Sequence, residues 1–191
     1  MKHKFFAKIF RMKYINRWQL MRCTTEENVS QHSLEVAILA HALANIGNVY
    51  CDKNVNAEHI AVCAMYHDIT EVITGDMPTP IKYANEDVNE SYKQLEHVAM
   101  FSLLNDLPSK LRTVYEVYLK DIPEDYGKYV KAADKLAALI KCQEEINSGN
   151  KDFVKAYESI VNYLESMCME EVDLFMKFYL PDFNLTIDEM K

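Results

Sequence analysis

The sequence predicts an all-α protein, and three observations carry that prediction. The 191 residues include only four glycines and five prolines, which is few for an architecture rich in turns. Apolar residues recur at helical spacing along most of the chain. No segment alternates apolar and polar residues for long enough to form a useful strand. A single bundle of helices is therefore the expected fold.

The length of the chain fits one domain, which we place at residues 1–191. Its core is expected at about residues 28–140, with a long C-terminal helix at about residues 153–179. Hydrophobic residues make up 49% of the chain and charged residues 26%, so it can bury a sizeable core without covalent cross-links.

The first half of the chain is expected to hold three helices. The first covers Phe5–Tyr14, and a polar loop follows at residues 23–29. The second runs from about Ser30 to Ile46, with Asn28 or Ser30 as its N-cap and Gly47 as its end. Its predicted apolar stripe consists of Leu34, Ile38, Leu39, Ala42 and Ile46.

After a polar loop at residues 49–55, Asn56 can cap a third helix over Ala57–Ile73, which Gly75 ends. The two prolines in residues 77–80 argue against regular helix there, because proline removes a donor and restricts its neighbours. Helices are then expected at Glu86–Leu104, Lys110–Leu119, Tyr126–Asn147 and Phe153–Tyr179, with breaks at Pro123, Gly149 and Pro181.

Charge and cysteine content narrow the class of protein. The formal net charge of -8 argues against a nucleic-acid polymer as partner, although a small anion can bind where a cation reverses the local field. Five dispersed cysteines, without a C-x-x-C pair, argue against a disulfide framework and favour a reducing, cytoplasmic location. Cys63 and Cys142 fall inside helical patterns and are expected in the core.

The basic, aromatic N-terminus has neither a signal-peptide pattern nor an apolar run long enough to span a membrane. Charges at Lys4, Lys8, Arg11 and Lys13 interrupt each apolar stretch. An amphipathic helix packed on the core is favoured over a membrane anchor.

Candidate chemistry begins with the pair His67-Asp68. On one continuous helix, Ile60, Ala64, Asp68 and Glu71 would share a face, which places two carboxylates on an apolar stripe. Buried carboxylates need compensation, for which a metal ion is a natural candidate. The alternative is a solvated helix edge beside an ordinary core histidine.

Two further residues repeat this anomaly. Asp134 lies in an alanine-rich helix pattern, where the alternative is a salt bridge to Lys131 or Lys135. His32 opens its own helix, where a lone histidine is more often structural. The joint pattern H…HD…D favours a metal site, and its mixed imidazole and carboxylate ligands suit Mn, Fe, Co, Ni or Zn.

The spacing of these residues resembles that of the HD-domain metal-dependent phosphohydrolases, and more narrowly the bacterial 5'-deoxynucleotidases. Five motifs carry the resemblance in family order and span most of the chain. They are I-N-R-W-Q-L-M-R at 15–22, E-N-V-S-Q-H-S at 27–33, M-Y-H-D-I-T-E at 65–71, T-G-D-M-P-T-P-I-K at 74–82 and K-A-A-D-K-L at 131–136.

The resemblance implies one divalent transition metal, such as Co or Mn, bound by His32, His67, Asp68 and Asp134. It implies catalytic roles for Glu71, Asp76 and Arg17, hydrolysis of deoxyribonucleoside 5'-monophosphates, and a homodimer. The implied substrate-binding residues are Arg17, Trp18, His32, Asp68, Asp76, Met77, Pro78, Thr79 and Asp134.

Other interpretations remain open. On general grounds Arg17 is more often a surface cation, and Trp18 more often a core anchor than a platform for a sugar. The enzyme could act on another phosphoester, such as a cyclic or hyperphosphorylated nucleotide. A helical module that binds a nucleotide or a protein without catalysis is disfavoured, because the chain keeps all four ligand types together with Glu71 and Asp76.

Overall fold

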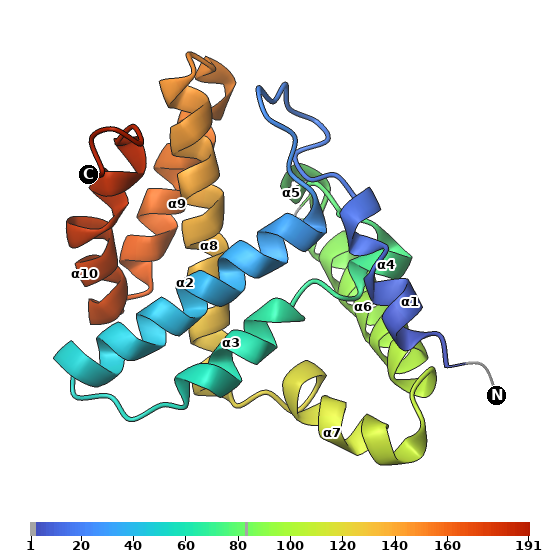
Figure 1. The fold of residues 1–191 in the computed structure, drawn as a ribbon. Helices are drawn as coiled ribbons and strands as arrows, with labels where there is room; N and C mark the ends of the chain where they lie inside the picture. Colours follow the sequence, from blue (N-terminus) through green and yellow to red (C-terminus); the bar gives the residue numbers. More distant parts are fainter. Residues whose placement is uncertain (1–2, 83) are drawn as a thin grey trace. The chain divides into compact units, whose positions relative to one another are not determined.

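The computed structural model describes residues 3–82 and 84–191, and within those ranges it forms helices and no strand (Figure 1). Its extended pairing there is an isolated bridge between Asn16 and Asn28. The predicted all-α class is confirmed. Residues 1, 2 and 83, which belong to the predicted single domain, lie outside the described residues.

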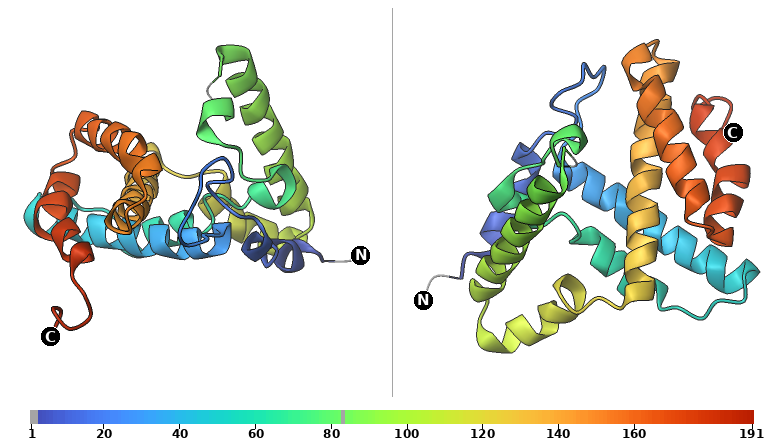
Figure 2. Two further views of the ribbon diagram at one scale, coloured as in Figure 1. Left: turned by 90° about the horizontal axis from the view of Figure 1, so that it is seen from above. Right: turned by 180° about the vertical axis from the view of Figure 1, so that it is seen from behind.

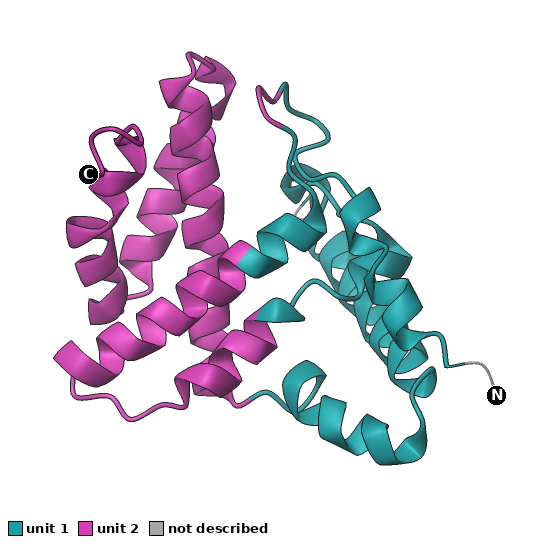
Figure 3. Cartoon of the chain, in the orientation of Figure 1, with its two compact units in different colours: residues 1–22, 26–34, 65–122 teal, residues 23–25, 35–64, 123–191 magenta. Residues whose placement is uncertain are grey.

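The chain forms two compact units, which Figure 3 distinguishes by colour. The first unit consists of Met1–Arg22, Glu26–Leu34 and Met65–Ile122. The second consists of Cys23–Thr25, Glu35–Ala64 and Pro123–Lys191. Helix α2 (Val29–Tyr50) begins in the first unit and continues into the second.

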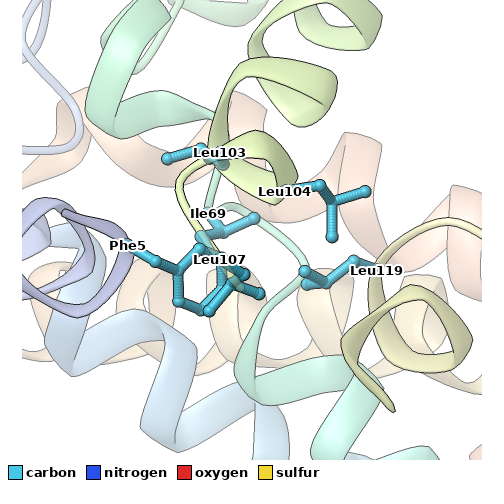
Figure 4. Close-up of a cluster of buried hydrophobic side chains, with 6 residues drawn as sticks. All are labelled: Phe5, Ile69, Leu103, Leu104, Leu107 and Leu119. Carbon is cyan, nitrogen blue, oxygen red and sulfur yellow. The ribbon is translucent and has the colours of Figure 1, made fainter. Parts of the chain in front are cut away.

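The first unit is built around α6 (Glu86–Asn105), against which three other helices pack. These are α4 (Glu71–Thr74), α5 (Thr79–Lys82) and α7 (Ser109–Leu119). The chain enters this unit through α1 (Phe5–Ile9) and a 3-10 turn, η1 (Met12–Tyr14). Figure 4 shows its hydrophobic cluster, formed by Phe5, Ile69, Leu103, Leu104, Leu107 and Leu119.

The second unit is organised along α8 (Glu124–Asn147). It also contains α3 (Ala57–Met65) except for its last residue, Met65, which belongs to the first unit. Helix α9 (Val154–Ser166) packs along α8 and lies beside it in the views of Figures 1 and 2. The remaining elements are η2 (Lys151–Phe153), α10 (Glu170–Phe178) and η3 (Leu180–Asn184).

Helix α2 confirms its predicted cap but not its predicted end, and it confirms its predicted apolar stripe only in part. Asn28 Oδ1 accepts from the backbone N–H groups of Ser30 and Gln31. The helix continues through Gly47 to Tyr50. A Cβ at Gly47 would lie 2.9 Å from Tyr129 Oη, so this glycine permits a close approach and ends nothing.

The buried face of α2 matches the predicted stripe only in part, although Leu39 and Ile46 are buried as predicted. Leu34 and Ile38 are 58% and 61% exposed, which contradicts their expected place in the core. Other apolar residues of the helix are fully buried, among them Val36, Ala40 and Leu43. A helix with apolar residues on more than one face has no unique apolar stripe, so tertiary packing decides which of these residues are buried.

The predicted third helix was too long. It begins as expected, with Asn56 Oδ1 accepting from His59 N–H at 2.8 Å, but α3 ends at Met65. Tight turns follow, because Ile69 N–H donates to Tyr66 O and Glu71 N–H to Asp68 O, before α4 begins. The common helical face proposed for Ile60, Ala64, Asp68 and Glu71 is therefore wrong.

Three other boundaries differ from prediction. The first helix is divided into α1 and η1. Residues 79–82 form the short helix α5, which tolerates Pro80 because the first turn of a helix needs no such donor. The last helix is divided into α9 and α10 by an irregular stretch in which Cys168 has φ 51°.

The three middle helices α6, α7 and α8 match their predicted bounds to within two residues at each end. Prolines stand at the N-cap positions of α7 and α8, where they cost no helical hydrogen bond. Cys63 and Cys142 are buried, as predicted. Among the described residues no helix is long and apolar enough to cross a membrane.

A buried ionic cluster in the second unit holds the loop at residues 23–25 against α8. The Glu145 carboxylate, 1% exposed, accepts from Lys141 Nζ at 2.6 Å and from Thr24 N–H and Asn150 Nδ2 at 2.9 Å. Lys141 Nζ also donates to Thr25 O at 2.7 Å. Burial alone would raise the pKa of Glu145, but the donors from Lys141, Asn150 and Thr24 lower it to about 2.

Glu145→Gln is therefore expected to lower the free energy of unfolding by about 3 kcal/mol at pH 7, because it leaves the Lys141 ammonium buried without its partner. Urea unfolding measures this loss. The matched control is Glu124→Gln, which removes an exposed ion pair with the same i,i+4 spacing on the same helix and should cause no measurable change.

The pH dependence of this difference has a defined sign. The folded-state pKa of Glu145 lies below its usual value of 4.5, so its stabilisation is present above about pH 4.5 and lost as the pH falls towards 2. The difference in the free energy of unfolding between wild type and Glu145→Gln should therefore decrease over that pH interval. A difference that stays constant with pH would mean that the charge of the Glu145 carboxylate does not stabilise the fold.

Candidate metal centre and substrate site

The pair His67-Asp68 lies in the turn between α3 and α4, and a hydrophobic anchor fixes that turn. Ile69, the next residue, is fully buried in the cluster with Phe5 and Leu103 (Figure 4). Thr70 is also buried. With Ile69 and Thr70 held in the core, the side chains of His67 and Asp68 remain partly accessible, at 13% and 22%.

His32 joins this pair, so three of the four predicted ligands come together in the first unit. Asp68 Oδ2 lies 3.0 Å from His67 Nε2 and 3.7 Å from His32 Nε2. The two imidazole rings are 5.3 Å apart. One ligand atom from each of the three residues lies within 4.8 Å of the others. Two imidazoles and a carboxylate at this separation suit a divalent transition metal.

His32 is completely buried, and Glu27 fixes its orientation. His32 Nδ1 lies 3.2 Å from Glu27 Oε1. When Nδ1 carries the proton that Glu27 accepts, Nε2 keeps its lone pair on the side of Asp68. This carboxylate–histidine pairing is the usual support of a metal-binding imidazole, and it agrees with the predicted ligand role of His32.

Arg17 and Trp18 precede His32 in an irregular segment of the same unit. Arg17 NH1 lies 3.4 Å from Asp68 Oδ2, and Arg17 Nε lies 2.9 Å from Glu27 Oε1. Trp18 Nε1 donates to Glu27 Oε2 at 2.8 Å. The two residues predicted to contact substrate are therefore held beside the candidate metal ligands, which argues against Arg17 as an ordinary surface cation.

The electrostatic character of Glu27 follows from these neighbours. Burial alone would raise its pKa, but the hydrogen bond with His32 and the charge of Arg17 hold the pKa below its usual value of 4.5. Glu27 is thus a carboxylate that meets three predicted functional side chains. No sequence pattern indicated a role for Glu27, since an acidic residue in a polar loop is not distinctive.

Glu71 is buried at the start of α4, with 9% of its surface exposed. Its Oε2 atom has no hydrogen-bond partner among the described residues. Burial, with the nearby carboxylates of Asp68 and Asp76, raises the pKa of Glu71 to about 9. The Glu71 carboxyl group therefore favours its protonated form, in which it can donate a proton.

Asp76 follows Gly75, which ends α4 as predicted and adopts φ 73°, a conformation that favours glycine. Tyr92 on α6 holds this loop, because its hydroxyl donates to Gly75 O at 3.3 Å. Burial raises the pKa of Asp76, while the charge of Arg17 opposes that shift. Sequence reasoning gave Tyr92 no role, because its contact depends on how α6 packs.

The other predicted site residues are placed as follows. Met77 and Pro78 are half-buried in the loop after Asp76, and Thr79 is exposed at the start of α5. Asp134 lies on α8 in the second unit, where its Oδ2 is 3.1 Å from Lys135 Nζ. Its role as fourth ligand, and the substrate contacts of residues 77–79, stay predictions.

Solved structures define the class of protein. The fold matches an HD-domain phosphohydrolase from Listeria innocua with a TM-score of 0.82 and 26% identity, covering 95% of this chain and 88% of that one. It also matches the HD phosphohydrolase DatZ of cyanophage S-2L, bound to dA and one catalytic Zn²⁺, with a TM-score of 0.65 and 15% identity over 93% and 95%. The chain has the fold of the HD phosphohydrolases.

Sequence comparison then gives the family. The family model described as 5'-deoxynucleotidase YfbR-like matches residues 4–183. The 5'-deoxynucleotidase of Enterobacter sp. strain 638 is 46% identical, and YfbR of Escherichia coli K12 is 45% identical, each over 97% of this chain and 94% of the relative. The chain belongs to the YfbR-like 5'-deoxynucleotidase family.

Proposed function

We infer that the protein is a metal-dependent 5'-deoxynucleotidase, which hydrolyses deoxyribonucleoside 5'-monophosphates to deoxyribonucleosides and inorganic phosphate. One observation carries this function beyond family membership. A candidate metal triad, an arginine and a buried acid with a raised pKa all occur in the first unit.

The proposed ligands are His32, His67 and Asp68, with Asp134 as the fourth. The donor set fits a divalent metal, and we propose a transition metal such as Co or Mn as the physiological ion. A divalent ion bound there would lower the pKa of water and neutralise charge on the phosphate.

Arg17 is proposed to bind the substrate phosphate. Its planar guanidinium presents donors in a geometry that matches two phosphate oxygens, and Glu27 already engages its Nε edge. The NH1 group that faces Asp68 is then directed towards the candidate ligands. The loop after α4 is proposed to contact the nucleotide through Asp76, Met77, Pro78 and Thr79.

Glu71 is proposed as the general acid. Hydrolysis forms a bond between the water oxygen and phosphorus and breaks the bond between phosphorus and O5', which leaves with the electron pair and needs a proton. A buried carboxylic acid with a raised pKa can supply that proton near neutral pH.

The test of this function is a panel of phosphoesters, assayed by phosphate release with Co²⁺, Mn²⁺, Mg²⁺ and Zn²⁺. We expect turnover of dAMP and TMP, and weak turnover of AMP and 3'-dAMP. We also expect Trp18→Ala to lower the ratio of kcat/KM for dAMP over AMP by about tenfold, because the indole no longer excludes the 2'-hydroxyl. Trp18→Phe is the matched control, since it keeps an aromatic ring.

Three outcomes would redirect the assignment. An unchanged ratio with uniformly lower activity makes Trp18 a packing residue and moves sugar selection to Asp76 and its loop. Faster turnover of cyclic or hyperphosphorylated nucleotides gives a different phosphohydrolase. Nucleotide binding without phosphate release under any of the four metals leaves a binding module.

We also propose that the enzyme acts as a homodimer, as the family resemblance implies. Support comes from α2, on which Leu34 and Ile38 are large, apolar and more than half exposed, one helical turn apart. Apolar side chains exposed in this way are a common feature of surfaces that self-associate.

A further inference from the structure

Glu27 contacts several proposed site residues, and the proposed chemistry assigns it no role. Its carboxylate side chain is 9% exposed. Oε1 lies 2.9 Å from Arg17 Nε and 3.2 Å from His32 Nδ1, and Oε2 accepts from Trp18 Nε1 at 2.8 Å. One carboxylate thus meets a proposed phosphate ligand, a proposed sugar contact and a proposed metal ligand.

The backbone of Glu27 supports the same segment. Glu27 O accepts from Arg17 N–H at 2.9 Å, and the adjacent bridge pairs Asn16 with Asn28. Trp18 has φ 59°, in the left-handed region that a bulky side chain rarely adopts. Such a conformation costs about 1–3 kcal/mol and persists where the surroundings fix it. Glu27 is part of those surroundings through its main chain and its side chain.

Each contact has a distinct chemical consequence. The 3.2 Å contact of Glu27 Oε1 with His32 Nδ1 favours the tautomer in which Nε2 can bind a metal. The pair with Arg17 engages the Nε edge and orients the guanidinium, whose NH1 faces Asp68. The bond from Trp18 fixes the rotation of the indole.

We propose that Glu27 is the positioning residue of this site, through which the metal ligand His32, the phosphate ligand Arg17 and the aromatic wall Trp18 are oriented together. Its loss impairs metal binding and substrate binding jointly, although Glu27 touches neither the metal nor the reacting atoms. This proposal rests on the proposed function for the identity of the substrate.

The test compares Glu27→Gln and Glu27→Asp with Glu26→Gln, a neighbouring change at an exposed position. For Glu27→Gln we expect Co²⁺ affinity to fall by about 10–100-fold, the range typical of outer partners of metal-binding histidines. We expect KM for dAMP to rise by about tenfold while kcat at saturating Co²⁺ falls less. Glu27→Asp keeps the charge and should recover part of both losses.

Trp18 supplies a readout that needs neither metal nor substrate. It is the single tryptophan of the chain, so intrinsic fluorescence reports its environment directly. Glu27→Gln should shift the emission and raise acrylamide quenching, whereas Glu26→Gln should change neither. The melting temperature is recorded for every variant, so that loss of the fold is recognised.

The proposal is overturned if Glu27→Gln binds Co²⁺ and dAMP as the wild type does, or if every loss follows a lower melting temperature. Failure of the proposed function is distinguishable from both. If the wild type does not hydrolyse dAMP, Co²⁺ affinity and Trp18 fluorescence still decide whether Glu27 positions His32 and Trp18.

Discussion

Replacing either member of the pair His67-Asp68 with alanine is expected to reduce phosphate release from dAMP to the level of the uncatalysed reaction. Each substitution removes a proposed ligand from the cluster in which one donor atom from each residue lies within 4.8 Å of the others. Metal affinity should fall by more than about 100-fold, since even outer partners of ligands are worth roughly 10–100-fold. Metal content after dialysis and steady-state rates are the measurements.

The controls separate metal loss from unfolding. His97→Ala removes an exposed histidine on α6 and should leave metal content and activity unchanged. EDTA should abolish wild-type activity, and an added transition metal should restore it. Full activity in metal-stripped wild type would contradict the metal assignment.

The same experiment decides the role of Asp134. If Asp134→Ala loses metal as His67→Ala does, Asp134 is the fourth ligand. If it keeps its metal and its activity, the ion pair with Lys135 is its main interaction, as the alternative interpretation of the sequence holds.

The fold could be predicted from sequence where helices are long and amphipathic. The bounds of α6, α7 and α8 follow from apolar spacing and from prolines that stand at helix starts. The end of α3 could not be predicted in this way. It depends on Ile69, which packs with Phe5 and Leu103 from distant parts of the sequence, and a periodic pattern contains no information about that contact.

The site shows the same division. The residue types of His32, His67 and Asp68 predicted them as ligands, and the structure brings these three side chains together. Asp68 and Glu71 do not share one helical face as predicted, yet the two carboxylates are close enough for Asp68 to raise the pKa of Glu71. The turn after α3 brings the carboxylates of Asp68 and Glu71 near each other, which a continuous helix was expected to do.

Glu27 and Tyr92 were missed because their importance lies in their partners. Glu27 is recognisable only when Arg17, Trp18 and His32 surround it, and Tyr92 only when its hydroxyl reaches Gly75 O. Contacts of this kind become apparent when separate segments are folded together, and no spacing rule anticipates them.

Glu71→Gln is expected to lower kcat for dAMP by about 10²-fold or more, with little change in metal content or KM. The amide has the shape of the carboxylic acid but cannot transfer its proton to the leaving O5'. Single-turnover rates at saturating dAMP, with metal content measured on the same samples, test this expectation. Glu90→Gln, at an exposed position on α6, is the control.

Stability provides an independent check on the protonation state. The pKa of Glu71 in the folded protein, about 9, lies above its usual value of 4.5. Its stabilising contribution is therefore complete below about pH 4.5 and lost as the pH rises towards 9. In EDTA-treated protein, Glu71→Gln should melt at a higher temperature than wild type at pH 7, and at about the same temperature at pH 4.

The two measurements together fix the role of Glu71. If Glu71 is a general acid held in a buried site, Glu71→Gln should have a lower kcat and, without metal, a higher melting temperature at pH 7. This trade-off between activity and stability is expected where a functional group destabilises the fold. A variant that loses metal in step with activity would make Glu71 a ligand or a support for one. A variant that melts lower than wild type at pH 7 would mean that the carboxyl group forms contacts in the fold that the amide cannot replace, and the general acid would then have to be sought at Asp76.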